Sequence, residues 1–123
     1  VWKTFDEMQG GEIFVKKIPS IKVTDIARVI APKSKFKIIG IRPGEKLHEQ
    51  MIGSEDSYYT YEYSDYFKIL PQINNWDKDK NRKKNGVKVL DGFTYSSDNN
   101  LEWMTNADLK AWIDNNKYYI GKI

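Results

Sequence analysis

The sequence predicts an α/β fold, a small mixed sheet with flanking helices, and two observations lead to this prediction. In residues 1–53, stretches with helical periodicity alternate with runs that favour strands, in the order helix, strand, helix, strand, helix. Residues 54–123 lose this alternation and carry short strand-like runs before a terminal helix over residues 105–116. A chain of 123 residues suits one modest core, so we expect a single domain over residues 1–123.

The first expected element is a helix over residues 1–8. Val1, Phe5 and Met8 fall on one helical face, and glycines follow at positions 10 and 11, where a helix commonly ends. Because the chain opens on this amphipathic stub without an initiator Met, we expect it to be a fragment of a longer protein. A native N-terminal helix after Met removal is the alternative.

The next elements are an expected strand over residues 12–18 and an expected helix over residues 24–31. The strand is rich in β-favouring side chains and ends at Pro19. For the helix, Thr24 is a capable N-cap and Pro32 closes the pattern. Its apolar positions recur every three or four residues: Val23, Ile26, Ala27 and Ile30. We expect this amphipathic helix to pack on the sheet.

A second strand is expected over residues 36–41, which are dense in isoleucine and too few for a helix. We expect it to lie parallel to the strand over residues 12–18, because a helix-bearing connection suits a right-handed crossover. Pro43 and Gly44 then favour a sharp turn into a short helix. That helix would carry two apolar residues on one face: Leu47 and Met51.

The turn carries the candidate binding residues, Arg42 and Glu45. A guanidinium offers a planar fork of donors that suits phosphate oxygens, and a nearby carboxylate accepts from sugar hydroxyls or holds the arginine in place. The pattern therefore predicts half of a clamp for a nucleotide diphosphate. A surface ion pair beside a helix start is the alternative.

Three tyrosines then alternate with polar residues, and a strand is expected over residues 66–70. Such a ladder stacks against a base or a sugar, or forms a packing surface, which is its commoner role. The tyrosines are Tyr59, Tyr61 and Tyr63.

The polar, mixed-charge segment over residues 76–86 predicts a mobile loop. Its basic run, Arg82-Lys83-Lys84, suits phosphate or nucleic acid, but a solvated loop is favoured because no aromatic platform adjoins it. Further on, Asp91-Gly92 predicts a two-residue hairpin turn or a bulge at the glycine. Thr105 and Asp108 form a capping-box pattern at the start of the terminal helix.

Composition limits the possible chemistry. The chain has no Cys, which excludes disulfides, thiolate catalysis and cysteine zinc sites, and its single His makes a histidine metal cluster improbable. The formal charge of +3 comes from 20 basic and 17 acidic interspersed residues, which argues against a strong nucleic-acid field. No apolar run reaches membrane-spanning length and no signal peptide is recognisable, so a cytoplasmic location is expected.

His48 beside Glu49 suits acid–base work, although an exposed polar pair is the commoner explanation.

Three stretches of the sequence resemble a known family. They are Gly10-Gly11-Glu12-Ile13-Phe14-Val15 with Lys17-Ile18-Pro19-Ser20, then Ile39-Gly40-Ile41-Arg42-Pro43-Gly44-Glu45-Lys46-Leu47-His48-Glu49, and the tail Tyr95-Ser96-Ser97-Asp98-Asn99-Asn100. They look like the C-terminal, substrate-binding portion of the extended short-chain dehydrogenase/reductases that act on UDP-N-acetylglucosamine. The inverting 4,6-dehydratases of pseudaminic acid biosynthesis are the most similar group.

The resemblance implies an enzyme that binds NADP in a Rossmann domain, oxidises C4 of the sugar, eliminates water across C5 and C6, and inverts C5. The glycine-rich turn and the Tyr-x-x-x-Lys pair of such enzymes lie upstream and are not in this sequence. It therefore implies no catalytic, cofactor-binding or metal residue here. By the same resemblance Arg42 contacts the UDP diphosphate and Glu45 the uridine ribose, while Lys17, Ser20 and Lys46 receive no assigned contact.

The resemblance also implies a UDP-sugar as ligand, a homo-oligomeric parent enzyme, and no nucleic-acid or membrane partner. Two alternatives remain at this point. One is a related enzyme of capsule synthesis, either a 4,6-dehydratase/5-epimerase or a 4-epimerase of UDP-sugars. The other is a non-catalytic binding module built on the tyrosines and the basic run.

Overall fold

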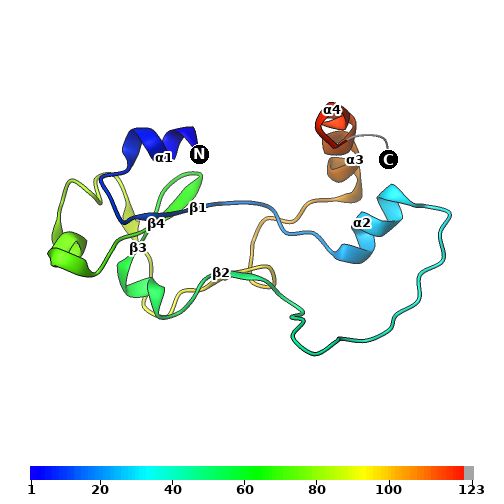
Figure 1. Ribbon diagram of the computed structural model, residues 1–123, viewed down its shortest axis with the longest axis horizontal. Coiled ribbons are helices and arrows are strands. Elements are labelled where there is room, and N and C mark those ends of the chain that lie inside the picture. The colour runs from blue at the N-terminus through cyan, green and yellow to red at the C-terminus, as the bar shows by residue number, and fades with distance from the viewer. Residues whose placement is uncertain (121–123) are drawn as a thin grey trace.

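Figure 1 shows a computed structural model of the chain, which describes residues 1–120 apart from the side chains at positions 74 and 77. The expected domain over residues 1–123 therefore ends outside the described residues. Helix α1 and the strands β1, β3 and β4 lie at one end, β2 lies in the middle, and the remaining α-helices gather at the other end (Figure 1). The α/β class, with sheets and flanking helices, is confirmed.

Two antiparallel sheets organise the described chain. The larger has four strands in the order β1-β4-β3-β5, and the smaller pairs β2 with β6. The bounds are β1 Ile13–Lys16, β2 Gln50–Ile52, β3 Thr60–Glu62, β4 Tyr66–Ile69, β5 Val87–Lys88 and β6 Tyr95–Ser96. The predicted strands over residues 12–18 and 66–70 are thus present as β1 and β4.

Helices flank these sheets at both ends. The α-helices are α1 Trp2–Glu7, α2 Val23–Ile30, α3 Asn106–Asn115 and α4 Lys117–Ile120, and the 3₁₀ helices are η1 Asp56–Tyr59 and η2 Ile73–Lys78. The predicted capping box is confirmed, because the Thr105 hydroxyl accepts from the Asp108 N–H while the Asp108 carboxylate accepts from the Thr105 N–H. Among residues 1–120, no helix has both the length and the apolar character needed to cross a bilayer.

The hydrophobic core joins the two sheets. It consists of Val15, Ile52, Phe67, Val89 and Tyr95, with Ile69 and Phe93 packed against it. The Phe67 ring lies 5.1 Å from the ring of Tyr95, a distance typical of stabilising aromatic pairs. The Tyr95 hydroxyl also bonds the backbone of Ile18 as donor and as acceptor, at 3.0 and 2.9 Å. The start of β6 is therefore fixed to the segment that follows β1.

A buried ion pair ties the loop after η2 to the chain ahead of β1. Arg82 Nη1 lies 2.7 Å from Glu12 Oε1, and the two side chains are 7% and 1% exposed. The same carboxylate accepts from the backbone of Gln9 and Gly10, and the guanidinium lies 4.3 Å from the Trp76 ring centre. The prediction of a solvated basic run is therefore wrong for Arg82.

The predicted parallel strand pair is also wrong. β1 pairs with β4 in antiparallel fashion, with Val15 opposite Phe67. Residues 36–41 form no strand and, within the described chain, no backbone hydrogen bond joins them to another segment. They run along the extended connection between α2 and β2 (Figure 1), where Ile38 is 92% exposed. Strand propensity does not supply a pairing partner, and β1 takes β4 because Val15 and Phe67 enter the same core.

Helix α2 differs from its prediction in its cap and its neighbour. The N-cap is Lys22, without a side-chain hydrogen bond, so Thr24 stands inside the first turn. The helix packs mainly against α3 rather than on a sheet. An apolar stripe predicts that a helix buries one face, but not against which element.

Two turns also differ from expectation. The short helix after Pro43 is absent, because Leu47 lies in a bend and Met51 belongs to β2. The turn at Asp91-Gly92 is present, with Gly92 at a φ of 81°. It does not close a hairpin, because β5 on one side pairs with β3 and β6 on the other pairs with β2.

Candidate functional site

The predicted pair, Arg42 and Glu45, is joined across a tight turn. The Glu45 N–H donates to the Arg42 carbonyl at 3.0 Å, and Gly44 adopts a φ of 86°, which favours glycine. The Arg42 N–H donates to Glu45 Oε2 at 2.9 Å, while Arg42 Nε donates to Oε1 at 2.7 Å. Arg42 Nη2 lies 2.6 Å from the same oxygen. The side chains are thus held in one relative orientation by both backbone and guanidinium.

This pairing leaves the guanidinium accessible to an anion. The Arg42 side chain is 76% exposed, and within residues 1–120 its Nη1 group has no hydrogen-bond partner. Hydrogen bonds from the Arg42 backbone N–H and, second, from its side chain hold the pKa of the Glu45 carboxyl below its usual value. The carboxylate therefore stays ionised at neutral pH and keeps the guanidinium oriented.

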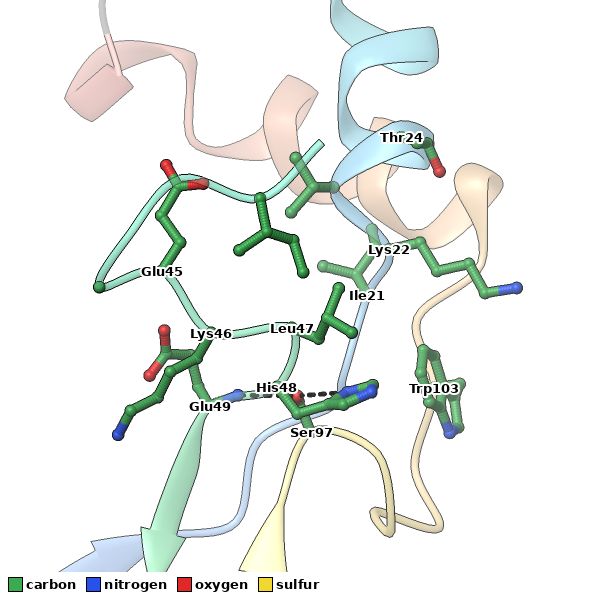
Figure 2. Close-up of a pocket in the computed structure, with 13 residues that line it drawn as sticks. Ile21, Lys22, Thr24, Glu45, Lys46, Leu47, His48, Glu49, Ser97 and Trp103 are labelled. Atoms are coloured by element: carbon green, nitrogen blue, oxygen red, sulfur yellow. Dashed lines mark hydrogen bonds between the residues drawn. The ribbon is translucent and has the colours of Figure 1, made fainter. Parts of the chain in front are cut away.

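A groove of about 920 Å³ lies beside this turn (Figure 2). Residues 21–24, 41 and 44–49 form most of its lining, with Ser97 and Trp103 from the second half of the chain. Glu45 lines the groove, whereas Arg42 is not among its lining residues. The volume falls within the usual range of small-molecule sites, about 300–1,000 Å³.

Ser97 fastens the turn to the end of β6. Its hydroxyl accepts from the Glu49 N–H at 3.1 Å and lies 3.4 Å from His48 Nδ1, and its own N–H donates to the Glu49 carbonyl at 2.8 Å. In Figure 2 the His48 ring and the Glu49 carboxylate point to different sides of the turn. His48 therefore has Ser97, not Glu49, as its polar neighbour.

Trp103 forms another wall of the groove and is held from two directions. A parallel bridge pairs it with Ser20, where the Ser20 N–H donates to the Glu102 carbonyl and the Met104 N–H to the Ser20 carbonyl, both at 2.8 Å. Its indole N–H donates to the Asn100 carbonyl at 2.9 Å. Ser20 is thus a buried partner in this bridge and does not line the groove.

The structure separates the remaining sequence candidates. Lys46 and His48 line the groove with Glu45, whereas Lys17 pairs with Glu62 at 2.6 Å on another surface. In the tyrosine ladder, Tyr63 stacks on Tyr66 with ring centres 4.5 Å apart and planes 4° apart. This contact favours packing as the role of Tyr63.

Sequence reasoning missed Ser97 and Trp103 as groove residues. Each reaches the groove through a contact distant in sequence, Ser97 with the turn and Trp103 with Ser20. The tail from position 95 resembles the family in sequence, but its composition does not indicate that it lies against the turn that carries Glu49.

Comparison with known proteins identifies the family. A family model described as "Polysaccharide biosynthesis protein" matches residues 1–71. Over 114 residues the chain is 53% identical to a UDP-N-acetylglucosamine 4,6-dehydratase (inverting) of Campylobacter jejuni subsp. jejuni serotype O:2, and 50% identical to that of serotype O:23/36. Each match covers 89% of this chain and 34% of the relative, so the chain spans about a third of the length of these curated relatives.

A solved structure agrees with this assignment. The X-ray structure of Pen from Bacillus thuringiensis matches with a TM-score of 0.73 and 25% identity, over 94% of this chain and 35% of that one. The resemblance to inverting 4,6-dehydratases and the fold of an extended short-chain dehydrogenase/reductase C-terminal portion are thereby confirmed. With its first 71 residues matched by the family model and half of its aligned residues identical to curated relatives, the chain belongs to the polysaccharide biosynthesis protein family.

Proposed function

We propose that this chain is the substrate-binding part of a nucleotide-sugar 4,6-dehydratase. The parent enzyme converts UDP-N-acetylglucosamine to a 4-keto-6-deoxy sugar nucleotide with inversion at C5, on a route to pseudaminic acid. The observation that carries the proposal is the exposed, braced Arg42 beside a groove of about 920 Å³, in a chain 53% identical to an enzyme of that name.

In this proposal Arg42 and Glu45 bind and orient, and neither transfers a proton. Arg42 Nη1, together with the second N–H of Nη2 beside its bond to Glu45, suits two diphosphate oxygens at once, which a planar fork recognises better than a point charge does. Glu45, ionised and inside the groove, accepts hydrogen bonds from ribose hydroxyls. Lys46 lines the same groove and adds positive charge near the diphosphate.

The proposed cofactor of the parent enzyme is NADP, which supplies hydride transfer when bound. The residues described here do not fit it. A dinucleotide binds at the carboxyl ends of parallel strands beside a glycine-rich turn, whereas every strand pair within residues 1–120 is antiparallel. We therefore assign no redox step to this chain and propose that the cofactor binds the rest of the parent enzyme. We also propose that the parent enzyme is cytoplasmic and homo-oligomeric.

The test is steady-state kinetics of the full-length enzyme with Arg42→Ala. Losing a charge-assisted contact to diphosphate costs about 1.5–3 kcal/mol, so we expect KM for UDP-N-acetylglucosamine to rise roughly ten- to a hundredfold with kcat little changed. Arg42→Lys should recover only part of the loss, because lysine keeps the charge without the fork.

The matched control is Arg28→Ala. Arg28 pairs with Asp25 at 2.9 Å with the same three-residue spacing, but on α2 and outside the lining of the groove. It should leave KM unchanged. If Arg42→Ala also left KM and inhibition by UDP unchanged while lowering the melting temperature, the surface ion-pair interpretation would replace the clamp.

A further inference from the structure

Trp103 is a rigid, half-exposed aromatic side chain in the wall of the groove. It is 47% exposed, although its backbone bridges Ser20 and its indole N–H is bonded to the Asn100 carbonyl at 2.9 Å. These two restraints act on the backbone and on the edge of the ring, so they leave a ring face free. A large ring fixed in this way is preorganised to stack on a planar group, because its side chain has little conformational entropy left to lose on binding.

The positions of Arg42 and Glu45 relative to the groove indicate which part of a bound nucleotide sugar would lie in it. Arg42, the proposed diphosphate contact, stands outside the lining, whereas Glu45, the proposed ribose contact, is part of it. A nucleoside diphosphate sugar bound in this order directs its base into the groove and its sugar away from it. The groove offers the base apolar neighbours, including Ile21 and Leu47.

We infer that Trp103 stacks against the uracil ring of the bound UDP moiety. The inference rests on the proposed function and extends it to the base. Figure 2 shows Trp103 across the groove from Glu45, with the His48 ring extending towards the same side. Every base has a π-face, so an aromatic platform supplies affinity for the base while Arg42 recognises the diphosphate.

The test measures UDP binding to the full-length protein. Trp103→Ala should weaken UDP binding roughly 5- to 150-fold, the usual range when a stacking side chain is removed. Trp103→Phe should retain most of the affinity, because phenylalanine keeps a stacking face. The matched control is Trp112→Ala, since Trp112 is 51% exposed on α3 and lies outside the lining of the groove.

Two further measurements identify the group that stacks. Binding of inorganic pyrophosphate should be unchanged by Trp103→Ala, because pyrophosphate has no base. UDP should alter the tryptophan emission of the wild-type protein, and this change should disappear in Trp103→Phe. The fluorescence result decides the matter even where Trp103→Ala fails to fold.

The outcomes separate this inference from the proposed function. If Arg42→Ala weakens UDP binding and Trp103→Ala does not, stacking is wrong and the clamp stands. If Trp103→Ala weakens binding of UDP-N-acetylglucosamine but not of UDP, the ring contacts the sugar and the inference is again wrong. If UDP does not bind the wild-type protein, both proposals fail.

Discussion

The Arg42–Glu45 pair is an exposed ion pair for which we propose a role in binding rather than in stability. Arg28–Asp25 has the same three-residue spacing, but it is joined by a single Nη1 contact at 2.9 Å. Exposed pairs of this kind stabilise proteins by about 0–1 kcal/mol. The two pairs also differ in their surroundings, because Glu45 lines the groove and neither Asp25 nor Arg28 does. The pair therefore serves to hold a guanidinium in position.

The titration of Glu45 tests this orientation directly. Its pKa is lowered, so the pairing favours the folded protein above the unfolded-state pKa and is lost as pH falls through the folded-state pKa. Carboxyl NMR should give a midpoint below that of a free glutamate. Arg42→Ala should restore only part of the shift, because the backbone N–H at position 42, the larger cause, remains. Arg28→Ala should leave the midpoint unchanged, and an unshifted wild-type midpoint would contradict the geometry.

At the scale of elements, local signals in the sequence were sufficient where the stabilising contact is local. The helix at α3 was predicted because Thr105 and Asp108 cap it three residues apart. Strands β1 and β4 were predicted from their side chains, but their pairing was not, because residues 36–41 offered a second run of equal propensity. Nothing local distinguishes the strand that finds a partner from the segment that stays unpaired.

Helix caps provide a prediction at this scale. Thr105→Ala should destabilise α3 by about 1 kcal/mol, because it removes an oxygen that accepts from the Asp108 N–H. Amides in the first turns of α3 should then exchange about fivefold faster by hydrogen–deuterium exchange. Thr24→Ala is the control, since Thr24 resembles a cap in sequence but lies inside α2. Equal effects of the two substitutions would show that the capping box contributes nothing.

At the scale of the whole molecule, contacts distant in sequence connect the predicted parts, residues 1–53 and 54–123. β1 joins β4, and Glu12 joins Arg82 across 70 residues. The sequence showed Arg82 only as one of three consecutive basic residues, and composition cannot reveal which of them is buried. The same holds for Trp103, whose place in the groove depends on Ser20. Such contacts follow from the assembled fold, so periodicity and propensity do not predict them.

The buried pair leads to a prediction about the segment over residues 76–86, whose overall mobility stays a prediction. Removing one partner of a buried ion pair leaves the other charge uncompensated and typically costs about 3–5 kcal/mol. Arg82→Met should therefore lower the unfolding temperature of the full-length protein and speed amide exchange in residues 79–86 and in β1. Lys84→Ala, at an exposed neighbour, is the control and should do neither.

A double substitution separates the charge from the packing in this pair. Adding Glu12→Gln to Arg82→Met removes the uncompensated carboxylate while keeping an acceptor for the N–H groups of Gln9 and Gly10. Part of the lost stability should return if the buried charge is the main cost. If the single substitution Arg82→Met leaves both the unfolding temperature and exchange at β1 unchanged, the pair does not hold the two parts together. In that case the antiparallel pairing of β1 with β4 and the shared core would be sufficient to do so.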